Sequence, residues 1–367
     1  MDKKFVMGIA AMAALTLVSC SSDDLDSFSD NSSKNEAISF DGYLGRSAVA
    51  VNGTRGSELT KDALQTSTEG FGVFGNYSKD SEGSTHAYGE NLFKNQKVFY
   101  SDSKWTYTPY KYWLAEGHID FLAYAPYDSK YDGNTALTGS KINFTVEHDV
   151  ALQKDLLWAN AVGQTQDDNP VKFTFNHALS RLGYTVKLKE KCADDVTITL
   201  KKITLAGAKD GTTPTFYTSG NIDLSKATKD ANLWSDYGSS KQYFDWLTKE
   251  YRVTSSTPHH PNKTEDNCDR NQEDDYLFVI PQNFSATGTD KLYVIVEYTI
   301  QYNDIPGATM TNKVYKQLPY NFEQGKAYMI NLTIGRPIDF NVDVVTGWIG
   351  EGNSETNYPI DSWDVIR

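Results

Sequence analysis

The chain has 367 residues, a formal net charge of −13 and three cysteines. The excess of acidic residues argues against nucleic acid and against anionic lipid headgroups as partners, because both select a basic surface. The length is too great for one small β-sandwich and suits two domains, and three cysteines are too few for a disulfide framework.

Residues 1–19 have the order of a secretory signal. Two lysines precede an uncharged, mostly apolar run of 14 residues from Phe5 to Val18. A membrane-spanning helix needs about 20 apolar residues, so this run predicts a cleaved signal. Cys20 directly follows Leu-Val-Ser, which predicts a lipoprotein signal with cleavage before Cys20 and lipid on its thiol. The alternative is an ordinary secretory signal with a chance cysteine.

Residues 20–36 are rich in Ser, Asp and Asn and contain few large apolar side chains. Such a segment cannot bury enough apolar surface to order itself. It therefore predicts a flexible tether between the lipidated cysteine and the folded part of the chain.

Short runs with apolar residues at alternate positions recur from residue 38 onward, separated by Gly, Asn, Asp and Pro. Alternation with a period of two is typical of half-buried β-strands. In the first half of the chain the predicted strands are 38–43, 71–74, 96–100, 104–108, 118–124, 142–146 and 155–159. The polar, acidic stretch 164–170 ends in proline and predicts a linker. It separates a predicted N-terminal domain, 37–168, from a C-terminal domain, 169–367.

The strand pattern resumes after this linker. The predicted strands there are 171–175, 183–188, 196–205, 215–218, 276–280, 292–301, 313–318 and 327–334. Residues 338–344 show the cleanest alternation in the chain. Residues 225–274 are polar and irregular, and they predict an insertion in which Trp234 and Trp246 are isolated anchors. Many short strands at this spacing predict an all-β protein with two β-sandwich domains in tandem.

The common motifs of catalysis are missing from the sequence, which has no GxSxG, HExxH, P-loop or GxGxxG pattern. Residues 128–139 begin like a calcium loop, but Gly139 stands where a bidentate glutamate is required. His259 and His260 could contact a metal, although adjacent histidines in a polar loop are usually solvated. His177 is expected to be a hydrogen-bonded core or cap residue. The sequence therefore predicts no enzyme, no cofactor and no metal site.

Two cysteines remain beyond Cys20. Cys192 and Cys268 form either one disulfide or two unpaired thiols, and neither has a CxxC partner for zinc. Exposed Tyr and Trp side chains could stack on sugar rings, but aromatic residues of an all-β chain far more often belong to the core.

The positions of two arginines suggest a mechanism of proteolytic cleavage followed by strand capture. Arg46 and Arg55 are the only arginines before Arg181, and both lie in small, polar segments after the first predicted strand. Exposed loops of this kind are preferred protease sites. A cut there would detach the strand at 38–43 and leave an apolar groove with unpaired backbone groups, which captures a complementary strand. The alternative is that both arginines are ordinary surface residues.

A family resemblance runs through essentially the whole chain. Its motifs are Cys20, Ile38-Ser39-Phe40 with Thr54-Arg55-Gly56, Tyr110-Lys111-Tyr112-Trp113 with Ile119 to Pro126, Asp155 to Ala159 with Val171 to Ser180, Leu318-Pro319 with Gly325 to Tyr328, and Val344 to Trp348. Each motif is weak alone, but their order is specific. On these motifs the chain resembles the fimbrillins of Bacteroidetes pili, the FimA-like and Mfa-like subunits. Residues 21–24, Ser-Ser-Asp-Asp, are similar to the signal that sends Bacteroidetes lipoproteins to the outer face of the outer membrane.

The resemblance implies two transthyretin-like β-sandwich domains of the seven-stranded Greek-key type. It also implies export as an outer-membrane lipoprotein precursor, with a lipid such as palmitate on Cys20, and later incorporation into an adhesive fimbrium at the cell surface. An arginine-specific protease then removes the first strand, and a C-terminal strand of the next subunit fills the groove. The displaced residues would be Ile38, Phe40 and Tyr43.

Carried to this sequence, the resemblance favours cleavage after Arg55, because Thr-Arg-Gly resembles the family's usual junction. Cleavage after Arg46 remains the alternative, because Arg46 lies closer to the end of the first predicted strand. The donor strand is expected within residues 338–367, and its candidate residues are Ile338, Phe340, Val342 and Val344. Residues 338–348 could instead be a permanent last strand, which leaves 358–366 as the donor.

The resemblance implies as partners other pilus subunits, the maturation protease and a ligand on a host or bacterial surface. A subunit without a donor strand would be the anchor or the tip of a pilus. The alternative function is a cell-surface binding lipoprotein, for example one that binds carbohydrate, which never polymerises.

Overall fold

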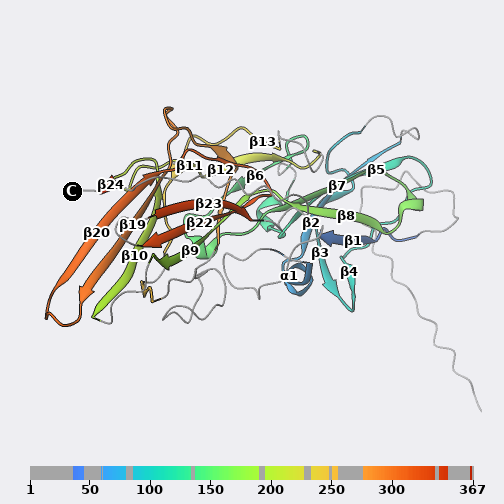
Figure 1. Ribbon diagram of the computed structural model, residues 1–367. Helices are drawn as coiled ribbons and strands as arrows, with labels where there is room; N and C mark the ends of the chain where they lie inside the picture. The colour runs from blue at the N-terminus through green and yellow to red at the C-terminus, as the bar shows by residue number, and fades with distance from the viewer. Residues whose placement is uncertain are drawn as a thin grey trace, which may run out of the picture. The chain divides into compact units, whose positions relative to one another are not determined.

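The all-β fold expected from the sequence is confirmed by a computed structural model (Figure 1). The structure describes residues 36–44, 59, 61–79, 86–133, 137–189, 195–226, 233–247, 250–254, 276–334, 339–345 and 364–365. They belong to one compact unit, residues 36–367. Among them, none of the helices combines the length and apolar character needed to cross a membrane.

A seven-stranded sheet contains most of the first half of the chain. Its order is β1 (Phe40–Leu44), β8 (Val171–His177), β7 (Leu157–Gln164), β5 (His118–Ala125), β2 (Phe71–Ser78), β3 (Phe93–Ser101) and β4 (Lys104–Thr106). The β1 strand runs parallel to β8, and the other neighbouring strands are antiparallel. The described helices are α1 (Lys61–Thr66) and the 3-10 turns η1 (Ser129–Tyr131), η2 (Val150–Leu152) and η3 (Gln166–Asp168).

A three-stranded sheet joins distant parts of the sequence. Its central strand is β12 (Ser219–Asp223), with β13 (Trp234–Ser235) on one side and β6 (Lys141–Thr145) on the other. Apolar residues of this sheet, among them Ile142 and Ile222, are fully buried.

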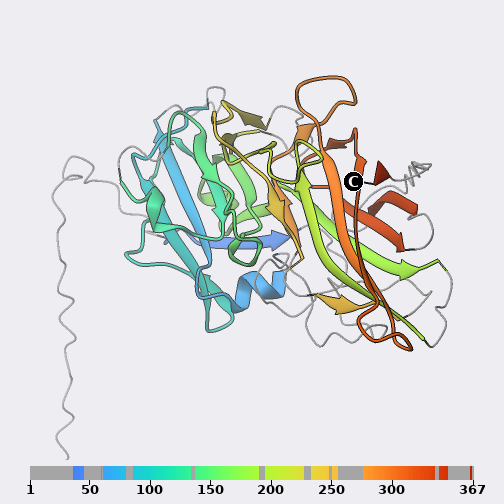
Figure 2. The ribbon, with the colours of Figure 1, turned by 90° about the vertical axis from the view of Figure 1, so that its left-hand side faces the viewer.

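The second half of the chain forms further sheets. One has the order β15 (Phe244–Asp245), β10 (Val196–Ala206), β19 (Tyr293–Tyr302), β20 (Thr309–Gln317) and β24 (Asp364–Val365), and β16 (Tyr251–Arg252) also pairs with β10. The β19–β20 hairpin is the long orange ribbon of Figure 2. Another has the order β17 (Leu277–Val279), β9 (Ser180–Leu188), β22 (Ala327–Ile334) and β23 (Asp339–Val345). Two small sheets pair β11 (Phe216–Tyr217) with β14 (Lys241–Gln242), and β18 (Gln282–Asn283) with β21 (Asn321–Phe322).

The β5 strand lies between two hydrophobic clusters, and both of its faces are therefore buried. Ile119, Phe121 and Ala123 belong to the smaller cluster, which includes the first strand. Leu122 and Tyr124 point to the opposite face and belong to the larger cluster, which continues into the sheets of the second half. A strand buried on both faces carries apolar residues at successive positions, which explains its continuous apolar pattern.

Strand pairing crosses the domain boundary predicted between residues 168 and 169. The β8 strand follows that boundary but lies in the seven-stranded sheet, and β6 precedes it but pairs with β12. Part of the predicted insertion 225–274 also belongs to the core. Trp246 is fully buried and packs against Tyr184, with ring centroids 5.0 Å apart.

Candidate functional site: the first strand and its surroundings

The backbone of the first strand is held on two sides. Residues Phe40–Leu44 pair in parallel with residues 171–175 of β8 (Figure 1). Just before β1, the Ile38 N–H donates to the Lys111 carbonyl at 2.9 Å, and the Trp113 N–H donates to the Glu36 carbonyl at 3.1 Å. The segment therefore enters the sheet between two other parts of the chain.

Asn169 fastens the start of this segment. Its Oδ1 accepts hydrogen bonds from the N–H and the hydroxyl of Ser39, both at 2.9 Å. Its Nδ2 donates to Glu36 Oε1 at 2.7 Å and to the Ala37 carbonyl at 3.3 Å. The stretch predicted only as a linker thus contributes a residue that positions the first strand.

Phe40 lies in a cluster of aromatic rings. Its ring centroid is 5.4–5.7 Å from those of four other side chains: Phe93, Tyr107, Phe121 and Phe173. We call these four residues the first-strand cluster. Phe40 is 4% exposed and Ile38 is 1% exposed. Removal of β1 would uncover this apolar surface and free the backbone edge of β8.

Tyr107 links the first-strand cluster to the backbone of the strand. Its hydroxyl donates to the Ile38 carbonyl at 2.8 Å and accepts from the Lys111 N–H at 3.2 Å. Burial raises the pKa of Tyr107 to about 12. The neutral phenol is thus the form that the folded chain favours.

Stability should fall at alkaline pH. An unfolded tyrosine loses its proton near pH 10, whereas Tyr107 keeps it until about pH 12. Its contribution, on the order of 2 kcal/mol, is fully present below pH 10 and is lost as the pH rises toward 12. Urea unfolding at several pH values should show a smaller alkaline loss in Tyr107→Phe. Tyr110→Phe removes an exposed hydroxyl from the same loop and is the matched control. An alkaline loss equal in both variants would contradict this assignment.

A buried carboxylate holds the backbone at Leu59, just before α1. Asp155 Oδ2 accepts a hydrogen bond from the Leu59 N–H at 2.9 Å and lies 2.8 Å from His177 Nδ1. The side chains of Asp155 and His177 are 0% and 4% exposed. His177 is buried, as the sequence predicted, and lies within ion-pair distance of Asp155, a partner that no local pattern had indicated.

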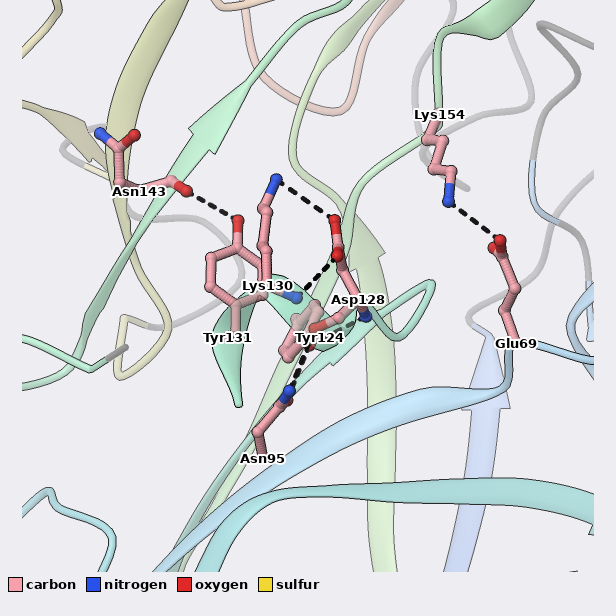
Figure 3. A network of polar contacts seen from close by, with 8 residues as sticks. All are labelled: Glu69, Asn95, Tyr124, Asp128, Lys130, Tyr131, Asn143 and Lys154. Atoms are coloured by element: carbon pink, nitrogen blue, oxygen red, sulfur yellow. Dashed lines mark hydrogen bonds and ion pairs between the residues drawn. The ribbon is translucent and has the colours of Figure 1, made fainter. Parts of the chain in front are cut away.

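A second polar network joins β3 and β5 to the residues that follow β5 (Figure 3). The Tyr124 hydroxyl donates to Asn95 Oδ1 at 2.7 Å, and Asn95 Nδ2 donates to the Asp128 carbonyl at 3.0 Å. Nearby, the Tyr131 hydroxyl donates to the Asn143 carbonyl at 2.7 Å. The first two bonds tie β3 and β5 to the turn after β5, and the third ties that turn to β6.

The other predicted site residues are described only in part. The described residues do not include Cys20, Arg46, Arg55, Cys192, Cys268, His259, His260 or Ile338. Tyr43 belongs to β1. Phe340, Val342 and Val344 belong to β23, where they pair in register with Leu332, Ile330 and Tyr328 of β22. The first part of the expected donor region is thus paired within its own chain.

The architecture is that of an all-β protein built around a buried, sheet-edge first strand. A fimbrillin-like family model matches residues 54–348, so the chain belongs to the fimbrillin-like family. No curated protein matches the chain.

A solved structure shows the same fold. A fimbrial protein from Bacteroides vulgatus ATCC 8482 is 21% identical, with a TM-score of 0.62; the match covers 85% of this chain and 99% of that one. A "putative cell adhesion protein" from Bacteroides ovatus ATCC 8483 is 17% identical, with a TM-score of 0.49, and the match covers 87% of this chain and 100% of that one.

Proposed function

We propose that this chain is a fimbrial subunit or adhesin of the cell surface that assembles by strand exchange. It is exported as a lipoprotein with lipid on Cys20. Cleavage after Arg55 or Arg46 then releases the first strand, and a strand from another subunit takes its place. The observation that carries the proposal is the burial of Phe40 in β1, and of Ile38 just before it, directly ahead of the segment with both arginines.

The energetics of the first strand favour exchange over simple loss. Burial of one large apolar side chain contributes about 1.5–3 kcal/mol to stability. Removal of Ile38 and Phe40 without a replacement would therefore cost several kcal/mol. The freed edge of β8 adds unpaired backbone groups to that cost. A strand with apolar residues at alternate positions would restore both contributions.

The C-terminal region offers two candidate donors, and their pairing differs. The β23 strand pairs with β22 over seven residues, whereas β24 pairs with β20 over two, Asp364 and Val365. Among the described residues, fewer paired residues must separate to release the second segment. We therefore favour residues 358–366 as the donor and 339–345 as a permanent last strand.

The test is limited digestion of the purified precursor with an arginine-specific protease. Mass spectrometry reports the new N-terminus, and the mass of the released fragment reports lipid on Cys20. Unheated detergent gels then show whether a ladder of multimers appears. We expect cleavage to create an N-terminus at Gly56 or Ser47 and to start assembly.

The matched variants are Arg46→Ala/Arg55→Ala and Arg252→Ala. The double variant should abolish both cleavage and the ladder, whereas Arg252 is an exposed arginine far from this segment in the sequence, and its loss should change neither. Assembly of the double variant would contradict the cleavage mechanism. A clean cut that yields only monomer would favour an anchor, a tip or a non-polymerising surface binder, whose carbohydrate ligand could be sought by tryptophan fluorescence.

A further inference from the structure

Two histidines and an aspartate converge at the start of β5. His118 and Asp120 lie on β5, and His86 lies in the segment before β3. Each offers one ligand atom, and these atoms all lie within 4.8 Å of one another. His86 Nδ1 is 3.0 Å from Asp120 Oδ1, and His118 Nε2 is 3.5 Å from Asp120 Oδ2. We call these residues the His-His-Asp cluster.

A β-bulge shapes the position of Asp120. The register between β5 and β7 shifts between Ile119 and Phe121, opposite residues 161–164. Gly163 has φ +65°, and its N–H donates to Asp120 Oδ1 at 2.7 Å. The Ala87 N–H donates to Asp120 Oδ2 at 2.9 Å. Two backbone amides therefore hold the carboxylate in one orientation, and bulges often serve to direct groups in this way.

The charge of Asp120 has few cationic partners. Its side chain is 0% exposed, and its ion pairs among the described residues are with His86 and His118, not with lysine or arginine. Burial of a carboxylate is costly unless the charge is compensated.

We propose that the His-His-Asp cluster binds one divalent transition-metal ion of the Zn²⁺ class. Two imidazoles and one carboxylate form a donor set that zinc accepts, and a fourth position remains for water. At metal–ligand distances of about 2.0–2.1 Å, ligand atoms around a tetrahedral ion lie about 3.3 Å apart. The two histidines approach different oxygens of Asp120, His86 at 3.0 Å from Oδ1 and His118 at 3.5 Å from Oδ2. With one ligand atom per residue the three atoms lie within 4.8 Å of one another, so a small inward shift of the side chains would bring them to the tetrahedral separation.

The site is accessible from solvent, and metal binding there would have a clear structural consequence. The His86 side chain is 37% exposed, while those of His118 and Asp120 are buried. A metal would join the segment that carries His86 to the bulge of the sheet. A Cβ atom at Gly163 would lie at an ordinary contact distance, 3.6 Å, from His86 Cε1, so the imidazole lies directly beside the bulge.

The experiment is a calorimetric titration of the full chain with Zn²⁺, after treatment with a chelator and without a histidine tag. Co²⁺ serves as a second probe, because its absorption spectrum reports coordination directly. His86→Ala is the informative variant, since this exposed side chain can be removed without opening the core. His148→Ala is the matched control, because His148 is exposed and lies outside the cluster.

We expect one Zn²⁺ per chain, an affinity at least tenfold weaker in His86→Ala, and no change in His148→Ala. A His259→Ala/His260→Ala variant tests the histidine pair that the sequence itself suggested. The proposal is overturned if the chain does not bind Zn²⁺, if His86→Ala binds as tightly as the natural sequence, or if binding disappears in the His259/His260 variant.

Discussion

Replacement of Phe40 by alanine is expected to lower the free energy of unfolding by about 3–5 kcal/mol. The ring is 4% exposed and contacts all four residues of the first-strand cluster. Truncation removes the apolar transfer energy and leaves a cavity among rigid aromatic rings, which cannot close easily. Urea denaturation followed by tryptophan fluorescence would measure the loss.

Asp41→Ala is the matched control for this prediction. Asp41 is the next residue of the same strand, and its side chain is exposed, so its loss should change stability by no more than about 0.5 kcal/mol. The Phe40→Ala chain should also be cut faster by an arginine-specific protease, because the strand that precedes the arginines is held less tightly. Equal stability of the two variants would show that β1 is not anchored through Phe40, and the strand-exchange proposal would lose its energetic basis.

Replacement of Gly72 by alanine should destabilise the protein by about 3 kcal/mol, through overpacking. A Cβ atom at this position of β2 would overlap the ring of Tyr124 and would lie 2.6 Å from Asn95 Oδ1. The Tyr124 hydroxyl and Asn95 form a buried hydrogen bond, so the added methyl group would also displace that pair. Thermal unfolding and the amide exchange of β2 and β5 would report both effects.

Gly42→Ala is the control for the glycine substitution. Gly42 is also buried in a strand, but a Cβ atom there would meet Trp105 at 3.4 Å, an ordinary contact distance. We expect a change of less than about 1 kcal/mol, because glycine-to-alanine replacement also reduces the entropy of the unfolded chain. Similar losses for both variants would mean that the Tyr124–Asn95 pair adapts to the methyl group.

Local pattern was enough to predict most of the strands. The alternation in 38–43, 196–205 and 327–334 predicted β1, β10 and β22 within a few residues of their ends. A strand places successive side chains on opposite faces, so its pattern can be read from neighbouring positions alone. The burial of His177 and the strand at 338–344 could be predicted in the same way.

Short strands in polar surroundings were not predicted from alternation. The segment with Trp234 and Phe244 was predicted as an irregular insertion, yet it pairs with β12 and β10 through two-residue strands. Runs of two residues are too short to show a period. Their burial depends on the sheets that already surround them, which local alternation cannot reveal.

The sequence by itself therefore determined that this is an acidic, all-β chain. It also determined that the first strand has alternating apolar residues and is followed by two arginines. Only the tertiary structure decided that β1 joins β8 in parallel, that β23 pairs with β22, and that His86 meets Asp120. The physical reason is that alternation is a property of neighbouring residues, whereas partners and register depend on packing between segments far apart in the chain.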